Sequence, residues 1–232
     1  MKAKIIHVLC EGQTEQGFVE EVLRPYLQEH GITGVKSILI TTNKKKNIRG
    51  GMLTYKHAER DICILQQTKQ DNDYECHVFT TMFDLYALPD DFPGYAEALT
   101  ISNPYERIVF LEKTFMDVIG KNRFIPYIQL HEFEALLFCG IEHLIKLYPN
   151  CEKKCKQLMK DVQKVTNPEL INNGPTTAPS KRIIKAIEGE KKTTYNYNKP
   201  VTGKTVTKEI GIDKLRANCP HFNEWIKQLL AI

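Results

Sequence analysis

The sequence predicts an α/β fold, in which a mostly parallel sheet is flanked by helices and followed by a helical, basic C-terminal region. Apolar, β-branched strands alternate with segments of helical period over residues 1–150, and this alternation is typical of parallel sheets. No convincing strand follows in residues 151–232. The composition, 42% hydrophobic and 26% charged over 232 residues, is that of an ordinary globular protein. We expect an α/β domain over residues 1–150 and a helical region over 151–232 packed on it.

The first elements are a buried strand and a helix. Ala3–Cys10 is apolar and β-branched and ends in Glu11-Gly12, which indicates a strand that runs into a tight turn. Gln13–Tyr26 carries apolar residues at helical spacing. Val35–Thr41 predicts a second strand, and a polar loop with Lys44–Lys46, Arg49 and Gly50-Gly51 follows it.

The middle of the chain continues the alternation. Tyr55–Thr68 resembles an amphipathic helix, and Glu75–Phe83 is a further apolar strand that stops at Asp84. Pro- and Gly-containing sequence then predicts a loop. The remaining predicted elements of this part are a helix at Pro104–Ile119, a strand at Phe124–Leu130, a helix start at His131–Cys139 and a turn or helix at Ile141–Tyr148.

The last third of the chain is predicted to be helical near Glu152–Val165, Ser180–Glu188 and His221–Leu230. Thr193–Lys208 is polar with interspersed tyrosines and lysines, so we expect a mobile loop there. Residues 151–232 hold 16 Lys and Arg against 8 Asp and Glu, whereas residues 1–150 hold 16 against 20. The basic part suits a phosphate-rich partner, although a solvated lysine-rich surface has the same composition.

The sequence argues against several classes of protein. No apolar run approaches the ~18 residues that a membrane span needs, and the short apolar N-terminal run is followed by no signal-peptide cleavage site. The 7 cysteines are odd in number and irregularly spaced. We therefore expect reduced thiols and a cytoplasmic protein.

Acidic residues follow the ends of the predicted strands. Glu11 follows the first strand, Asp84 ends the third, and Glu132 and Glu134 follow the fourth. Ligands of parallel α/β sheets bind beyond the carboxyl ends of the strands, so these side chains are expected to converge. Glu15, one turn after Glu11, shares its helix face. Converging carboxylates suit Mg²⁺ or Mn²⁺, and two such ions can promote phosphodiester cleavage.

Each acid also has a structural interpretation. Glu15 is compatible with an ordinary first-turn glutamate that interacts with the helix dipole, and Asp84 with a turn cap. Glu132 and Glu134 point apart if they lie on a helix, so we expect at least one of them to be structural. His131 is a candidate ligand, general base or buried capping residue.

Three motifs resemble a known family. EGQTE at Glu11–Glu15 resembles the opening motif of Toprim domains, particularly those of the overcoming-lysogenization-defect nucleases. FDLYALPDDFPGY at Phe83–Tyr95 and FIPYIQLHEFEALLF at Phe124–Phe138 resemble a bacterial and archaeal family of Toprim-like proteins of unknown function. APSKRI at Ala178–Ile183 fits the same family.

The resemblance implies a Toprim-like fold and Mg²⁺-dependent phosphodiester cleavage. It also implies an AAA/ABC-type ATPase encoded nearby and a role in anti-phage defence. Glu11 matches the first Toprim acid, a metal ligand and acid/base; Glu15 matches the second glutamate, and Asp84 the first Asp of the DxD motif. Tyr86 stands where that motif has its second Asp, so a second metal needs other acids, from Glu132, Glu134, Asp90 or Asp91. A one-metal or non-catalytic site stays open.

Basic residues are candidates for contacts with nucleic acid. Lys181 and Arg182 are the favoured phosphate contacts, and Lys181 is also a candidate for stabilising the transition state. Lys45, Lys46 and Arg49, with the following glycine amides, form a second candidate set. We expect a metal-dependent nuclease that cuts DNA or RNA and acts with an ATPase. The alternatives are a non-catalytic module that binds nucleic acid or the ATPase, and a small phosphotransfer enzyme.

Overall fold

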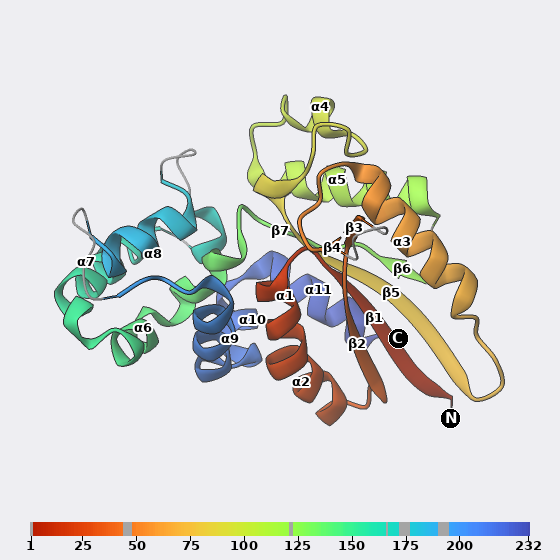
Figure 1. Ribbon diagram of the computed structural model, residues 1–232, viewed down its shortest axis with the longest axis horizontal. Helices are drawn as coiled ribbons and strands as arrows, with labels where there is room; N and C mark the ends of the chain where they lie inside the picture. The colour runs from red at the N-terminus through yellow and green to blue at the C-terminus, as the bar shows by residue number, and fades with distance from the viewer. Residues whose placement is uncertain (1, 44–47, 121–122, 166, 172–176, 190–194) are drawn as a thin grey trace.

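The computed structural model describes residues 2–43, 48–120, 123–165, 167–171, 177–189 and 195–232, and it confirms the α/β prediction (Figure 1). The central sheet is parallel, with strand order β2-β1-β5-β6, and β7 also pairs with β5. Its strands are β1 (Ala3–Cys10), β2 (Gly34–Leu39), β5 (Glu75–Asp84), β6 (Phe124–Ile125) and β7 (Ile128–Gln129). A separate antiparallel pair joins β3 (Thr41–Asn43) to β4 (Ile48–Arg49).

The register of the sheet aligns the carboxyl ends of its strands. Cys10 at the end of β1 pairs with Leu39 of β2 and with Met82 of β5. Along β1 the side chains alternate between two buried clusters, since Val8 and Cys10 belong to one and Leu9 to the other. The sheet is therefore covered on both faces, which suits the continuous apolar runs of its strands.

Helices cover the two faces in separate groups. One face carries α3 (Tyr55–Thr68), α4 (Tyr95–Ala98) and α5 (Pro104–Ile119). The other face carries α1 (Gln13–Phe18), the π-helical turn η1 (Val19–Leu23), α2 (Arg24–Glu29), α9 (Lys199–Ile210), α10 (Ile212–Asn218) and α11 (Pro220–Leu230).

The remaining helices lie beside this sandwich, at the end away from α3 and α5 (Figure 1). They are η3 (Phe133–Gly140), α6 (Ile141–Leu147), η4 (Pro149–Cys151), α7 (Glu152–Val162), η5 (Pro168–Leu170) and α8 (Pro179–Ile187), and the short 3₁₀ turn η2 (Leu85–Ala87) follows β5. In the described part of the chain, no helix is both long and apolar enough to cross a membrane.

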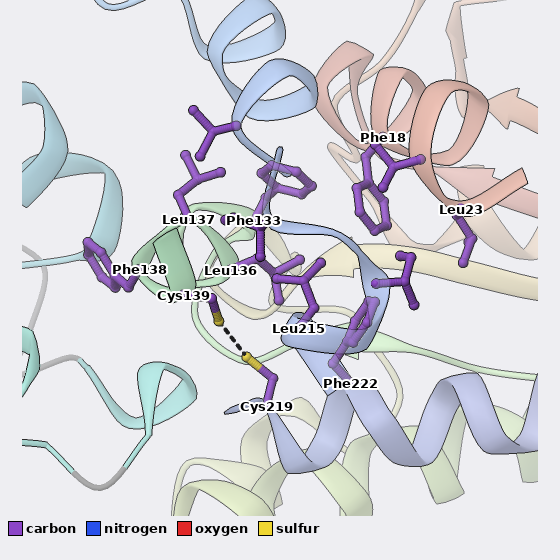
Figure 2. Packing of buried hydrophobic residues seen from close by; sticks show 14 of the residues in the cluster. Phe18, Leu23, Phe133, Leu136, Leu137, Phe138, Cys139, Leu215, Cys219 and Phe222 are labelled. Carbon is purple, nitrogen blue, oxygen red and sulfur yellow. Dashed lines mark hydrogen bonds between the residues drawn. The ribbon is translucent and has the colours of Figure 1, made fainter. Parts of the chain in front are cut away.

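The core joins the two halves of the chain. Phe18 of α1 makes edge contacts with Phe133 of η3, at 5.6 Å between ring centroids, and with Phe222 of α11, at 6.1 Å. The thiols of Cys139 and Cys219 approach to 3.5 Å, as a sulfur hydrogen bond (Figure 2). This packing fixes η3 against the sheet. The domain boundary at residue 150 stays a prediction, with residues from both sides of it in one core.

One predicted element was wrong in kind. Thr193–Lys208 was expected to be a mobile loop, but its described part contains the first ten residues of α9, while residues 190–194 lie outside the description. The Asn198 side chain caps this helix by accepting the Val201 N–H at 3.1 Å. His131–Cys139 was expected to start a helix, and a helical segment does begin there, with 3₁₀ geometry over Phe133–Gly140.

Two further elements differ in extent. The strand predicted at Phe124–Leu130 is split into β6 and β7 on either side of Pro126, which has no N–H to give to the sheet. The helix predicted at Gln13–Tyr26 continues to Glu29 and contains the π-helical turn η1.

Candidate functional site

Acidic side chains from the ends of β1 and β5 meet at one edge of the sheet. A Glu11 carboxylate oxygen accepts the backbone N–H of Asp84 at 3.1 Å. Asp84 in turn accepts the N–H of Phe133 at 2.8 Å, which ties η3 to the end of β5. Each acid is thus held by the backbone of the next element, and the edge expected to gather carboxylates does so.

Two further glutamates complete an acidic cluster, which we define as Glu11, Glu15, Asp84 and Glu134. Glu15 lies in the first turn of α1, is 4% exposed and accepts the N–H of Gly12 at 2.9 Å. It therefore caps its helix and also interacts with Glu11 and Asp84. Glu134, in η3, has no exposed surface and accepts the Tyr197 hydroxyl at 3.2 Å.

A lysine from the C-terminal region enters this cluster. The Lys199 ammonium lies 3.1 Å from a Glu134 oxygen and 3.6 Å from a carboxylate oxygen of Asp84. Lys199 was not among the site residues predicted from the sequence. Asn198-Lys199-Pro200 has the pattern of a helix start, with a capping Asn and an early Pro, which could have revealed α9 but not the target of its lysine.

Gly203 brings α9 close enough to place Lys199. A Cβ atom at Gly203 would lie 2.8 Å from Thr14 of α1 and 2.9 Å from the ring of Phe133. Both distances are shorter than side chains tolerate, so only glycine permits this contact. Because Lys199 lies one helical turn before Gly203, the close packing carries its side chain to the acids.

Burial and mutual repulsion raise the pKa values of the cluster. Burial raises the pKa of Glu11 to about 7, with a further contribution from the Glu15 charge, although the Asp84 N–H and Lys199 act in the opposite direction. Burial likewise raises the pKa values of Glu15, Asp84 and Glu134. Burial disfavours the charged Lys199, but the carboxylates together outweigh it and raise its pKa above the usual range.

The donor set fits a hard divalent cation. Buried carboxylates with raised pKa values concentrate negative charge, and oxygen ligands of this kind suit Mg²⁺ or Mn²⁺. The contact of Lys199 with two of these acids indicates that the cluster accommodates positive charge. Within the described residues, no three or more His, Cys, Asp or Glu side chains are arranged to hold a metal ion as they stand.

Other residues singled out in the sequence lie around the cluster. Glu132 turns toward α8 and accepts the Ser180 N–H at 2.9 Å, so it is Glu134 that faces Asp84 and Lys199. Tyr86 is 43% exposed, and its ring centroid lies 5.3 Å from that of the buried His131. Burial lowers the pKa of His131 to about 4, which keeps its ring neutral at neutral pH.

The loop after β5 contributes no further acid to the cluster. Asp90 and Asp91 are exposed, and Asp91 accepts the Tyr55 N–H at 2.8 Å, at the start of α3. The expectation that either aspartate replaces the second acid of the DxD motif therefore finds no support in this arrangement.

Lys181 and Arg182 line a groove of about 600 Å³ between α7 and α8, together with Lys154 and Lys185. We call these four residues the basic groove. Its α8 side begins one residue after Ser180, whose N–H is bound by Glu132. The basic groove is therefore connected through Ser180 to Glu132, which lies two residues before Glu134 of the acidic cluster.

The side chains of the second predicted basic set stay a prediction. Lys45 and Lys46 lie outside the described residues, as does the side chain of Arg49. The amides expected to approach a phosphate are already engaged, because Gly50 N–H donates to the Ile40 carbonyl and Gly51 N–H to that of Glu11, each at 2.8 Å.

Comparisons with known proteins place the chain in a family. No curated protein matches it. It is similar to a solved structure, the C-terminal region of the Burkholderia pseudomallei OLD protein, at 16% identity and a TM-score of 0.41, over 98% of each chain. The model of the family described as a domain of unknown function, DUF4276, matches residues 10–230. Since this match covers nearly the whole sequence, the chain belongs to the DUF4276 family.

Proposed function

We propose that this protein is a Mg²⁺- or Mn²⁺-dependent nuclease that hydrolyses phosphodiester bonds in DNA or RNA. The observation that carries the proposal is the acidic cluster at the carboxyl edge of the parallel sheet, with Lys199 reaching two of its members. Such an edge is where open α/β sheets bind their ligands. Burying several carboxylates next to one another costs free energy, so a purely structural role does not explain this arrangement.

In this proposal Glu11, Asp84 and Glu134 hold the metal, and Glu15 supports Glu11. The bound ion would activate water and stabilise the leaving oxygen. With a pKa of about 7, Glu11 is able to exchange a proton near neutral pH when it is not bound to metal. Lys199 carries a positive charge at the same place, where it would contact a phosphate oxygen and stabilise negative charge in the transition state.

The basic groove supports a nucleic-acid substrate. Its four cationic side chains are drawn from two helices that face each other across the hollow, and Asp161 is the acid among its lining residues. Lysine and arginine bind phosphates mainly through charge and the release of counterions. Lys181 of the groove follows Ser180, whose N–H is bound by Glu132 two residues before Glu134, and this connection would suit a strand that runs from the groove to the metal.

The wider setting is proposed from the sequence alone. The resemblance of its motifs to the overcoming-lysogenization-defect nucleases supports an AAA/ABC-type ATPase as partner and a role in anti-phage defence. A cytoplasmic location is proposed from the 7 irregularly spaced cysteines, which suggest reduced thiols. Association with the ATPase would bring the nuclease to its target or regulate it.

Two observations favour a second candidate, a non-catalytic module that binds nucleic acid or the ATPase. Lys199 already neutralises part of the acidic cluster, and Tyr86 replaces the second Asp of the Toprim motif. In a protein that binds no metal, this lysine would neutralise part of the buried negative charge.

Metal binding and cleavage together test the proposal. Calorimetry with Mg²⁺ and Mn²⁺ should detect binding to the wild type that Glu11→Gln and Asp84→Asn both lose. The matched control is Asp90→Asn, which alters an exposed aspartate in the loop after β5 and should bind metal like the wild type. DNA and RNA cleavage should follow the same pattern. Cleavage that persists in Glu11→Gln would refute the assignment, and absence of metal binding with substrate present would favour the non-catalytic module.

A further inference from the structure

A second hollow lies on the other side of the α8 start. It has a volume of about 440 Å³, and its lining includes Tyr86, Leu99, Arg107 and Glu132. Its volume lies within the range of small-molecule sites. We call it the Tyr86 pocket. Ala178 lines this pocket, whereas Thr177 and Lys181 line the basic groove, so the first turn of α8 separates the two hollows.

The Tyr86 pocket borders the acidic cluster through the backbone. Tyr86 lies two residues after Asp84, in the 3₁₀ turn that ends β5. Glu132, on the opposite wall, directly precedes Phe133, whose N–H binds Asp84. A ligand group in the pocket is therefore a near neighbour of whatever the acids hold.

The walls of the pocket are apolar and exposed. Tyr86 is 43% and Leu99 61% exposed, and large apolar side chains left in water mark binding surfaces when they gather at one hollow. Arg107 donates to the Ile101 carbonyl through Nε and Nη2, and Glu132 accepts the Ser180 N–H through one oxygen, so the Arg107 Nη1 group and the second Glu132 oxygen supply a donor and an acceptor at the same site. A flat ring with polar edges matches this combination, because its face would stack on tyrosine while its edge meets the charged groups.

We infer that the Tyr86 pocket binds an unstacked nucleobase of the substrate strand, next to the phosphate at the acidic cluster. This inference rests on the proposed nuclease function and sharpens it. A base enters such a pocket only when it is unpaired, so the preferred substrate is single-stranded or locally opened nucleic acid. The tyrosine that takes the place of a Toprim acid would thus serve substrate recognition.

Binding without cleavage tests the inference. Short single-stranded DNA carrying 2-aminopurine, and the corresponding duplex, are titrated with the metal-free protein in EDTA while anisotropy and 2-aminopurine fluorescence are recorded. The wild type should bind the single strand more tightly than the duplex and quench the fluorescence by stacking. Tyr86→Leu should weaken binding of the single strand about fivefold or more and abolish quenching, while Tyr86→Phe keeps both.

Two further variants locate the effect. Leu99→Glu places a negative charge on the other exposed wall and should weaken binding of the single strand in the same direction. Tyr74→Leu removes a tyrosine that is 82% exposed just before β5, at the opposite end of the strand from Tyr86, and should bind like the wild type.

The outcomes separate this inference from the function on which it rests. Equal binding by wild type and Tyr86→Leu, without quenching, would overturn the pocket assignment and leave the nuclease proposal standing. Tighter binding of the duplex would also overturn it. Failure to bind either DNA, with corresponding RNA probes negative too, would overturn the inference together with the proposed substrate.

Discussion

Glu134 and Glu169 have the same side chain and no exposed surface, and both lie in 3₁₀ segments, yet their surroundings differ. Glu169 accepts the N–H groups of His221 and Phe222, at 3.0 and 2.9 Å, and the Tyr105 hydroxyl at 3.0 Å. Glu134 instead faces Lys199 and the other acids of the cluster.

The difference shows how a structural carboxylate is distinguished from a candidate functional one. The charge of Glu169 is satisfied by the first amides of α11, where a helix favours an anion. Glu134 adds a negative charge where three others already lie, and its neighbours raise the cost of that charge. Burial is common to both residues, so it is the set of partners that indicates a ligand site.

The largest expected effect is on cleavage, and it should separate the two glutamates. Glu134→Gln keeps the shape of the side chain but removes a charged metal ligand, so metal-dependent cleavage should fall by about 100-fold or more. Glu169→Gln lies away from the acids and should stay within about threefold of the wild type. Initial rates with Mg²⁺ measure both. Equal losses of cleavage in the two variants would show that Glu134 is not a metal ligand distinct from the structural Glu169.

Stability should respond in the opposite order. Glu169→Ala leaves two backbone N–H groups and a tyrosine hydroxyl without their buried acceptor, and should lower the free energy of unfolding by about 3 kcal/mol. Glu134→Gln removes a buried charge but also its ion pair with Lys199, so it should lower the free energy of unfolding by less than Glu169→Ala does. Urea denaturation in EDTA measures both values. If Glu169→Ala has the same free energy of unfolding as the wild type, this carboxylate does not have the structural role assigned to it.

The pH dependence of the free energy of unfolding should reveal the cost of burying charged carboxylates in the acidic cluster. The folded pKa of Glu11 is about 7, above its ordinary value of 4.5, so the folded state keeps a proton that the unfolded chain has released. The contribution of Glu11 to the free energy of unfolding is complete at low pH and is lost as the pH rises from 4.5 to about 7. The loss is on the order of 1–3 kcal/mol.

Urea midpoints in EDTA across this range provide the measurement. The raised pKa values of Glu15, Asp84 and Glu134 act in the same direction. Glu11→Gln should flatten the profile, and Mg²⁺ should oppose the loss above neutral pH. A wild-type midpoint that rises over the range would contradict the raised pKa values.

The smallest expected effect is at the basic groove. Lys181→Ala and Lys185→Ala each remove one cation from α8, so each should weaken nucleic-acid binding a few-fold and lower the salt slope by about 1. Lys227→Ala is the control, because this exposed lysine lies on α11 and pairs with Glu224. Binding that is unchanged across a salt series would exclude the groove from the interface.

The fold was largely predictable because the spacing of apolar residues along the sequence predicts both strands and helices. The bounds of α3 and α5 were predicted to the residue, since their apolar stripes are clear. The helix α9 was missed because three of its five buried residues, Thr202, Gly203 and Thr207, are small or polar, and only Val206 and Ile210 are apolar. The Thr202 hydroxyl lies 2.6 Å from that of Tyr148, and Thr207 donates to the Gly203 carbonyl at 2.8 Å, so these side chains are buried without being apolar.

The candidate site was predictable to the extent that it depends on the sheet. Glu11 and Asp84 follow strands whose carboxyl ends share an edge, and the sequence marks both ends. The choice between Glu132 and Glu134 depends on how η3 turns, and the position of Lys199 depends on the packing of α9 at Gly203. Neither is encoded in a local pattern, because both arise from contacts between distant segments.

The origin of Lys199 has a consequence for the newly made protein. During synthesis Glu11, Asp84 and Glu134 leave the ribosome well before Lys199, and α9 docks on α1 only after most of the chain has emerged. Until then the three acids lack the ammonium that the finished fold places among them. The contacts between Lys199 and the acidic cluster therefore form late, and a chain released before α9 would carry its acids without this ammonium.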